Sequence, residues 1–498
     1  MKYGLSNEQL ETIRRLLSED PAIHEAILFG SRAIGTFKEA SDIDLAIKGD
    51  SFDIFMANSL KSRLEDETHI PFFFDIVAYK NVVSEDLKRR IREDGVVIYF
   101  GLGEWREYIL ENIIQKFIDY RGKTPNKTTS GIPLITAKIV KSGKILEPNE
   151  FIAEDAYDSW MTRGLPEIND VVLTTEAPLG EVALIKDKSV ALAQRIITLR
   201  GSKNFVYNPF LKYLFQSPVG QYKLQSRASG TTVFGIKASV LKKISITLPP
   251  LPEQKAIAQV LSSLDDKIDL LHRQNKTLEA MAETLFRQWF VEEAGDDWED
   301  GHLLELIQLV GGGTPKTSIP EYWNGNIPWL AGADIASNHK TFVTCTQKCI
   351  TEIGLNNSAT KLLPKYSTVI SARGTVGKYC LLAQTMAFSQ SNYGALPKNS
   401  NCFFFVYLLI NHVVEELRSS SYGSVFDTIT TTTFRENKVM LPPKNEIIKF
   451  EGNVSPYFKK MFSNKSQIQT LEKLRDTLLP KLISGQVRVK YRESKKNN

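Results

Sequence analysis

The sequence has few cysteines and lacks any long apolar run. Its four cysteines in 498 residues, at 345, 349, 380 and 402, are too few for a disulfide framework, and the first two have no second ligand pair at the spacing of a zinc site. No apolar stretch approaches the roughly 18 residues of a membrane span, and the first eight residues lack the apolar core of a signal peptide. We therefore expect a cytoplasmic protein with reduced thiols and no membrane partner.

The composition is that of a folded protein with an uneven distribution of charge. Hydrophobic residues make up 42% and charged residues 24%, and the length predicts roughly three or four domains. Residues 1–100 contain 13 Lys and Arg against 18 Asp and Glu, which leaves 49 basic and 39 acidic residues for the remainder. An acidic block followed by a basic one favours a polyanionic partner for the larger part, although so mild an excess also occurs on surfaces that bind nothing.

An internal repeat is visible at an offset of about 193 residues. Residues 469–478 align without gaps on residues 276–285, and five of the ten positions are identical. The same offset pairs Pro442-Pro443 with Pro249-Pro250, and further upstream Gln390 corresponds to Gln194. A slowly drifting offset over such a length indicates a duplicated unit, made of a mixed α/β stretch followed by a long helix.

Two long helices are predicted from hydrophobic periodicity, over 253–292 and 444–484. In the first, apolar residues alternate at three and four positions from Leu261 to Trp289, which is typical of a coiled-coil seam. Asn275 falls inside this seam, where a lone polar residue usually fixes register or pairing. Double prolines precede both helices and end any earlier element.

The stretches before the helices read as short strands joined by glycine turns, for example 170–175 with 180–185 and 367–372 with 377–382. Basic and hydroxyl side chains gather in and beside these loops and are suited to donate to phosphates and base edges. The DNA-contact candidates are Arg121, Lys123, Lys127, Thr174, Thr175, Lys316, Arg373 and Thr431. Loops are polar in most proteins, so each of these is also explained as ordinary surface.

The duplicated layout closely resembles the specificity subunits of type I restriction-modification systems over about residues 103–486. The motif that carries the resemblance is Leu-Pro-Pro-Leu-Pro-Glu-Gln-Lys-Ala-Ile-Ala at 248–258, followed by Leu-Asp-Asp-Lys-Ile at 264–268. The second copy departs from it, with Lys444-Asn445-Glu446 at the corresponding turn. The resemblance implies a non-catalytic subunit without a cofactor, which reads double-stranded DNA, docks methyltransferase subunits and is joined by restriction motor-nuclease subunits.

In domain terms, the resemblance implies target recognition domains at 103–252 and 296–443, two antiparallel spacer helices at 253–292 and 444–484, and a basic tail at 485–498. Neither methyltransferase nor motor motifs are expected in this part. Asn208-Pro209-Phe210 faintly resembles an adenine-methyltransferase motif, but a helix start with proline is the simpler interpretation. Gly122-Lys123-Thr124 lacks the earlier glycine of a phosphate loop.

The first 100 residues contain a different pattern, with three aspartates beside apolar strands. Asp42 and Asp44 are two apart, so in a strand they project from one face, and Asp75 follows a later apolar run. Converging carboxylates suit Mg²⁺. Gly30 permits close approach of a phosphate, and Ser31 at a helix start can hold it.

This arrangement resembles the minimal nucleotidyltransferases of the DNA polymerase β superfamily, including small enzymes that transfer AMP to a partner protein. The resemblance implies catalytic and metal-binding roles for Asp42, Asp44 and Asp75, nucleotide binding at Gly30, Ser31 and Arg32, and Mg²⁺ with a nucleoside triphosphate as cofactors. Two alternatives remain open: Asp42 caps a turn while Asp75 pairs with Arg32, or the domain is a catalytically degenerate docking module.

The sequence therefore predicts an α/β multidomain protein. A small nucleotidyltransferase α/β domain at 1–101 precedes two α+β target recognition domains, separated by two long antiparallel coiled-coil helices. Because the repeat covers most of the chain, we expect DNA specificity to be the main function. The competing hypothesis is an enzyme that chiefly transfers AMP to a protein or nucleic acid and is targeted by the DNA-binding part.

Overall fold

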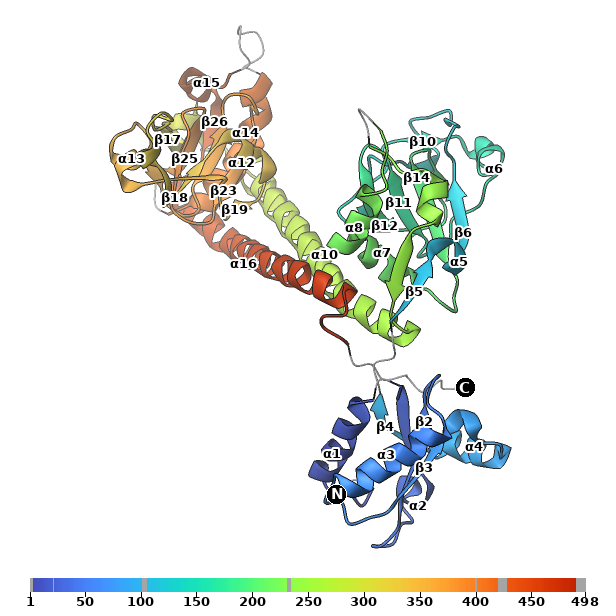
Figure 1. Cartoon of the computed structure of the whole chain (residues 1–498). Helices are drawn as coiled ribbons and strands as arrows, with labels where there is room; N and C mark the ends of the chain where they lie inside the picture. The colour runs from blue at the N-terminus through green and yellow to red at the C-terminus, as the bar shows by residue number, and fades with distance from the viewer. Residues whose placement is uncertain are drawn as a thin grey trace. The chain divides into compact units, whose positions relative to one another are not determined.

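The computed structural model describes residues 3–20, 22–100, 105–230, 234–398, 401–419 and 428–489 (Figure 1). The Gly101 to Gly103 junction and most of the predicted basic tail, from residue 490 onward, lie outside the described residues. The chain divides into two compact units, one formed by residues 1–265 with 474–498 and the other by residues 266–473.

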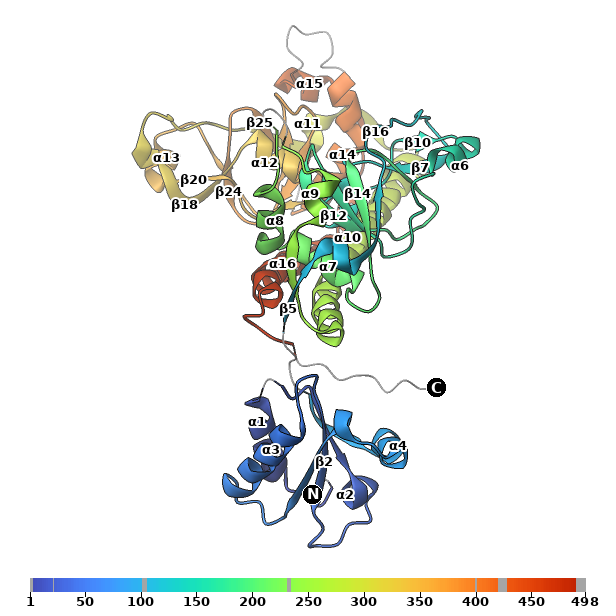
Figure 2. The same ribbon diagram turned by 45° about the vertical axis from the view of Figure 1, so that its right-hand side comes forward.

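The N-terminal domain, residues 3–100, is a four-stranded sheet in the order β3-β2-β1-β4, with helices packed against it (Figure 2). Its elements are α1 (Asn7–Ser18), β1 (Glu25–Phe29), α2 (Gly30–Ile34), β2 (Ile43–Lys48), α3 (Ile54–Asp66), β3 (Phe74–Ala78), η1 (Tyr79–Asn81), α4 (Glu85–Glu93) and β4 (Val96–Phe100). Strand β1 pairs antiparallel with β2 and β4, whereas β3 is parallel to β2. Apolar residues from Leu5 to Tyr99 supply the core between sheet and helices.

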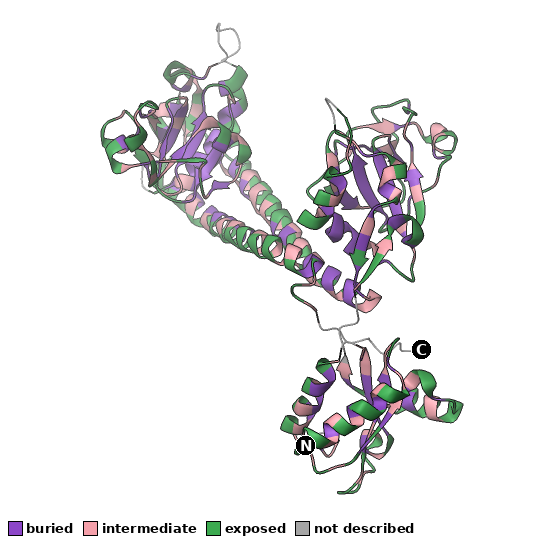
Figure 3. Ribbon diagram, viewed as in Figure 1, coloured by how far each residue is buried: buried purple, intermediate pink, exposed green. Residues whose placement is uncertain are grey.

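The first repeat, residues 105–248, follows. Its elements are β5 (Arg106–Ile109), α5 (Leu110–Ile113), β6 (Ile114–Asp119), β7 (Ile132–Ile135), β8 (Val140–Lys141), β9 (Lys144–Ile145), β10 (Phe151–Ile152), η2 (Glu154–Ala156), α6 (Tyr157–Trp160), β11 (Val171–Thr175), β12 (Leu179–Leu184), β13 (Ala191–Leu192), β14 (Ile196–Gly201), α7 (Asn208–Gln216), α8 (Pro218–Gln225), α9 (Ala238–Lys242) and β15 (Ser245–Leu248). All five residues of β11 are buried, which is why this strand lacks the alternating pattern of a one-sided sheet (Figure 3).

The second repeat, residues 299–441, has a similar order of strands and helices. They are β16 (Glu299–His302), α11 (Leu303–Leu306), β17 (Ile307–Gly311), η4 (Pro320–Tyr322), β18 (Trp323–Leu330), α12 (Gly332–Ser337), β19 (Phe342–Val343), β20 (Lys348–Ile350), α13 (Glu352–Asn356), β21 (Leu362–Leu363), β22 (Thr368–Ser371), β23 (Tyr379–Leu382), β24 (Met386–Phe388), β25 (Asn392–Pro397), α14 (Phe403–Ser419), α15 (Thr431–Glu436) and β26 (Lys438–Leu441). Strands β19 and β21 are added to its sheets, and its described residues include no counterpart of the β8–β9 hairpin.

Sheet topology shows that the two repeats share one architecture. The order β12-β11-β14-β6 in the first recurs as β23-β22-β25-β17 in the second, where β19 extends the sheet. The smaller sheets correspond as well, since β10-β7-β13 matches β20-β18-β24, with an antiparallel and then a parallel pair in each. Each repeat begins and ends on a paired strand, β5 with β15 and β16 with β26.

Each repeat leads into a long helix, α10 (Leu251–Arg287) and α16 (Lys444–Ile483). Within residues 266–473 the two helices are antiparallel: Ile268 and Leu271 pack on Ile468, whereas Ala282 shares a core with Phe450 and Val454. Asn275 lies in this seam, where its side-chain oxygen accepts a 2.8 Å hydrogen bond from the Asn464 amide. Asn464 is fully buried, and its side-chain oxygen Oδ1 has no hydrogen-bond partner among the described residues.

The first long helix changes character before the predicted end at residue 292. Helix α10 ends at Arg287 and passes into a π-helical turn, η3 (Gln288–Glu292), from which Phe290 packs against Phe286, Phe405 and Phe450. Across the described ranges, the longest helices are too polar to cross a membrane.

Candidate functional sites

The predicted nucleotide site lies at the turn between β1 and α2. Gly30 adopts a left-handed conformation with φ +69°, and a Cβ built there would lie 2.2 Å from Oδ2 of Asp44. Glycine is therefore required both by the backbone and by the carboxylate that covers it. Ser31 is partly exposed in the first turn of α2.

Two of the predicted carboxylates are brought together by strand register. Asp44 and Asp75 are directly paired on parallel strands β2 and β3, so their side chains share one face of the sheet. Asp42 is exposed and precedes β2, which begins at Ile43, so it is placed by the loop and not by the strand as predicted. Burial, followed by the charges of Asp75 and Asp42, raises the pKa of Asp44.

Arg32 takes a position that the sequence did not predict. Its side chain is only 1% exposed, and its three guanidinium nitrogens donate to the backbone carbonyls of Ser41, Asp42, Tyr3 and Gly4. Its guanidinium lies over the Phe72 ring at 4.2 Å. Arg32 thus fixes the loop that carries Asp42, and the alternative pairing with Asp75 is not formed.

The donor set can be tested against the predicted divalent ion. In the described part of the chain, no three His, Cys, Asp or Glu side chains gather closely enough to hold a metal by themselves. Asp42 and Asp75 nevertheless lie near enough to Asp44 to raise its pKa, as expected for carboxylates that share a site. Mg²⁺ is usually bound by one or two carboxylates together with water and substrate phosphates, so these residues fit an ion that is completed by a nucleotide.

The DNA-contact candidates of the first repeat differ in accessibility. Arg121 is partly exposed and pairs with Glu176 at 3.6 Å, Lys127 pairs with Glu150 at 2.7 Å, and Lys123 is exposed. Thr174 and Thr175 end the strand predicted at 170–175 and lie within β11, 0% and 2% exposed, where the Thr174 hydroxyl accepts from the Glu181 amide. Both side chains are packed within the sheet, and this burial argues against the DNA contact predicted for them.

The candidates of the second repeat are all exposed. Lys316 follows β17, Arg373 follows β22, and Thr431 begins α15 behind its N-cap Thr430. Arg195 was not among the predicted residues, and its Nε lies 3.0 Å from Glu176 Oε1. The only related feature in the sequence is the neighbouring Gln194, which corresponds to Gln390 of the second repeat.

The motif at the start of α10 serves as an anchor. Glu253 is fully buried and paired with Arg488 at 2.6 Å, and Gln254 bonds the backbone of Phe205, Tyr207 and Pro249. Three turns further, Asp265 accepts from Lys212 Nζ at 3.0 Å and Tyr213 Oη at 2.7 Å, both on α7. Its other oxygen accepts from Arg475 of α16. In α7, Asn208 bonds the Gly201 amide, as expected for a structural residue.

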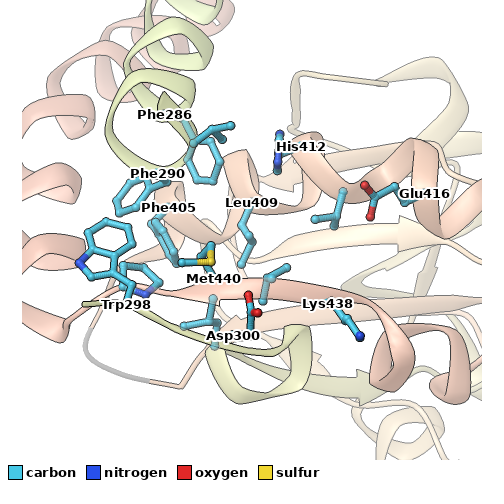
Figure 4. Close-up of a pocket in the computed structure, with 15 residues that line it drawn as sticks. Phe286, Phe290, Trp298, Asp300, Phe405, Leu409, His412, Glu416, Lys438 and Met440 are labelled. Carbon is cyan, nitrogen blue, oxygen red and sulfur yellow. The ribbon is translucent and has the colours of Figure 1, made fainter. Parts of the chain in front are cut away.

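A cavity of about 290 Å³ lies at the end of α10 (Figure 4). Phe286, Phe290 and Phe405 line its apolar wall, and all belong to the core that joins α10 to α14. Its polar lining residues are Asp300, His412, Glu416 and Lys438. We interpret it as a packing gap at the helix junction, since the aromatic rings around it already contact one another.

Comparison with known proteins identifies both parts of the chain. The family model of the type I restriction modification DNA specificity domain matches residues 103–280 and 295–476, and that of the polymerase beta nucleotidyltransferase matches residues 11–100. The type I restriction enzyme MjaIX specificity subunit of Methanocaldococcus jannaschii is 27% identical over 389 residues, covering 72% of this chain and 87% of the relative. The HindI specificity subunit of Haemophilus influenzae is 22% identical and covers 59% and 81%.

A solved structure supports the fold. The type I restriction-modification S subunit from M. genitalium aligns with a TM-score of 0.53 at 18% identity, covering 76% of this chain and 96% of that one. Both copies of the family domain coincide with the two topological repeats and their helices. The chain therefore belongs to the type I restriction-modification DNA specificity family and carries a polymerase-β-type nucleotidyltransferase domain before it.

Proposed function

We propose that this chain reads a bipartite, asymmetric DNA site and docks the methyltransferase subunits that modify it, with restriction subunits joining the same assembly. The supporting observation is the duplication: one topology occurs twice, with different side chains in its loops. Two unlike readers on one chain predict two unlike half-sites. A helix of 37 residues is about 55 Å long, which is enough to span more than one turn of DNA.

Half-sites on one face of DNA lie about 10 base pairs apart, centre to centre. If each repeat reads about four pairs, roughly six unread pairs separate the halves. The test is methylome sequencing of cells that carry or lack this gene, together with its methyltransferase subunits. We expect adenine methylation at a split, non-palindromic motif; a continuous or palindromic motif contradicts the proposal.

For the N-terminal domain we propose Mg²⁺-dependent transfer of a nucleotide to a protein or nucleic acid. Gly30 and Ser31 would accept the triphosphate, and Asp42 and Asp44 would hold the metal. When bound, the ion neutralises charge on the leaving pyrophosphate. The Asp75 carboxylate, beside Asp44 in register, would accept the proton of the attacking hydroxyl or complete the metal site. Arg32 acts by holding the Asp42 loop.

The test is incorporation of α-labelled nucleotide by the full chain and by the variant Asp42→Asn/Asp44→Asn. Asparagine keeps the shape of aspartate but removes two charges from the metal site, so transfer should fall by orders of magnitude while the melting temperature is preserved. The control Asp66→Asn/Asp86→Asn removes two exposed carboxylates elsewhere in the domain and should leave transfer unchanged. Equal signal from all proteins, or none from the wild type with any of four nucleotides, favours a docking module.

A further inference from the structure

The two repeats carry an equivalent hairpin loop after their central buried strand. In the first it joins β11 to β12, and in the second it joins β22 to β23. Register fixes the equivalence: Thr174 pairs with Ile196 as Ser371 pairs with Asn392. Two residues after Thr174 and Ser371, Glu176 and Arg373 therefore occupy equivalent positions in the two repeats. One residue before Ile196 and Asn392, Arg195 and Ser391 are equivalent in the same way.

Backbone hydrogen bonds confirm this correspondence. The Thr175 amide donates to the Arg195 carbonyl at 2.8 Å, and the Ala372 amide donates to the Ser391 carbonyl at 2.9 Å. The next contact is also repeated, since the Ile236 amide donates to Thr175 and the Ile429 amide to Ala372. The two repeats therefore share these backbone hydrogen bonds but present different side chains there, and of the equivalent residues Arg195 and Ser391 only Arg195 has a positive φ.

In the first repeat, two arginines share one carboxylate beside this loop. Glu176 contacts Arg195 at 3.0 Å and Arg121 at 3.6 Å, and the arginine side chains remain 54% and 37% exposed. Arg195 has φ +72°, a conformation that is unfavourable for residues other than glycine. Strained residues of this kind persist where their surroundings hold them, often at binding sites.

In the second repeat, the loop itself supplies the cation. Arg373 stands where Glu176 stands in the first, is exposed, and has no side-chain hydrogen bond or ion pair within the described ranges. Its carbonyl is held by the Thr375 amide at 2.9 Å and the Ser371 hydroxyl at 3.2 Å. A fixed backbone thus carries a guanidinium whose donors are unused.

We infer that bases are read at these two hairpins by two arginines: Arg373, on the second hairpin, reads a guanine in one half-site, and Arg195, which precedes β14 and is positioned by Glu176 of the first hairpin, reads a guanine in the other. This inference rests on the proposed DNA-reading function and assigns its specificity to named residues. A guanidinium matches O6 and N7 of guanine in the major groove with two parallel hydrogen bonds. Glu176 keeps the Arg195 guanidinium aligned, and Arg121 offsets its negative charge near the phosphates.

The experiment assembles the full chain with its methyltransferase subunits and offers duplexes in which each base pair of the wild-type site is randomised. Methylated molecules are then sequenced. Arg373→Ala should reduce preference for one guanine roughly 10- to 100-fold in one half-site, and Arg195→Ala should do so in the other. Arg373→Lys keeps the charge but not the two-pronged geometry, so it should lose the same preference. Glu176→Gln should weaken the Arg195 position only.

Lys348→Ala is the matched control, because it removes one cation from β20, the edge strand of the other sheet in the second repeat. It should change no base preference. Arginine variants that retain full preference at every position, or an Arg373→Lys variant that reads DNA like the wild type, overturn the inference while the proposed function stands. If the wild type itself methylates no defined sequence, the proposed function fails and the inference falls with it.

Discussion

At the scale of single residues, the contact between Gly30 and Asp44 is the sharpest constraint in the N-terminal domain. A side chain at Gly30 must displace the Asp44 carboxylate, whereas Gly35, with φ +82°, has open space where a Cβ would stand. Both positions impose the same backbone strain on alanine, about 1 kcal/mol. Comparing alanine substitutions at Gly30 and Gly35 therefore distinguishes the effect of backbone strain from the effect of moving the Asp44 carboxylate.

We expect Gly30→Ala and Gly35→Ala to lower the free energy of unfolding similarly, with an additional cost for Gly30→Ala from the clash. Nucleotide transfer should fall at least about tenfold in Gly30→Ala alone, because only there is the carboxylate moved. Denaturant unfolding and labelled-nucleotide transfer measure the two effects. Equal loss of transfer in both variants contradicts a specific role for the Gly30 contact.

The sequence placed two of the three aspartates on strands correctly. Asp44 and Asp75 lie on neighbouring apolar strands as predicted, whereas the alternation argument for Asp42 and Asp44 fails because Asp42 precedes β2. The sequence could not place Arg32, since its partners are carbonyls of Tyr3, Gly4 and Ser41, contacts that carry no side-chain signature. Thr174 and Thr175 were placed correctly at the end of a strand, but their burial was not predicted, because threonine is also common on the exposed face of a strand.

Glu451 should make the stability of the fold around α14 and α16 depend on pH. Its carboxylate on α16 accepts from the backbone amides of Phe404 and Phe405 at the start of α14, and burial raises its pKa to about 7. The folded state thus binds this proton more tightly than the unfolded chain. The stabilisation is complete below the unfolded pKa of about 4.5 and is lost as the pH rises through about 7.

Glu451→Gln should remove this dependence, because glutamine does not titrate. We expect the wild type to lose up to about 3 kcal/mol relative to the variant between pH 5 and pH 8. Melting temperatures of both proteins across that range measure it. Parallel curves show that the carboxylate titrates normally.

At the scale of elements, the long helices combine a predictable and an unpredictable part. Apolar periodicity predicted both helices and marked Asn275 as a polar residue in the seam. Its partner Asn464 was not predicted, since a polar residue interrupts the very pattern that locates the α16 seam between Met461 and Ile468. Only the pairing of the helices reveals that the two interruptions meet.

Sliding one helix by a heptad separates the two amides and leaves both buried without a partner. We therefore expect Asn275→Leu or Asn464→Leu alone to destabilise by about 1–3 kcal/mol, whereas the double variant should equal or exceed wild-type stability. Disulfide trapping between Leu271→Cys and Ile468→Cys, which share a core one turn from the Asn275–Asn464 pair, reports the register. The double variant should also form disulfides between cysteines placed for slipped registers. If it forms the disulfide of one register only, the two asparagines do not select the register.

At the scale of the whole molecule, the repeat could be found from sequence because its helices kept an ungapped alignment. The strand order that the two repeats share could not be predicted from the sequence, since short strands separated by insertions show little sequence similarity. Charge and motif predicted a separate N-terminal domain, and one hydrophobic core draws on residues from Leu5 to Tyr99.

A chain that begins at residue 105 should consequently fold, bind methyltransferase subunits and methylate the full-length protein's target. Its specificity should be unchanged within about twofold, because both proposed reading hairpins lie beyond that point. Methylome sequencing with the shortened gene provides the measurement. The full-length variant Asp42→Asn/Asp44→Asn is the control that keeps the N-terminal domain, and it should methylate the same target. If the shortened protein folds and binds its methyltransferase subunits but no longer methylates the target, the N-terminal domain takes part in DNA recognition.

The unequal anchors of the two long helices bear on how such a protein can evolve. Asp265 of α10 is held by Lys212, Tyr213 and Arg475, and the position 193 residues later is Phe458, which stacks on Phe404 at 4.5 Å. A first repeat copied into the second position brings a lysine against a phenylalanine, and a buried charge without its partner is strongly destabilising. New specificities should therefore arise by replacing a repeat within its own position, and the order in which the two half-sites are read is inherited with the anchors.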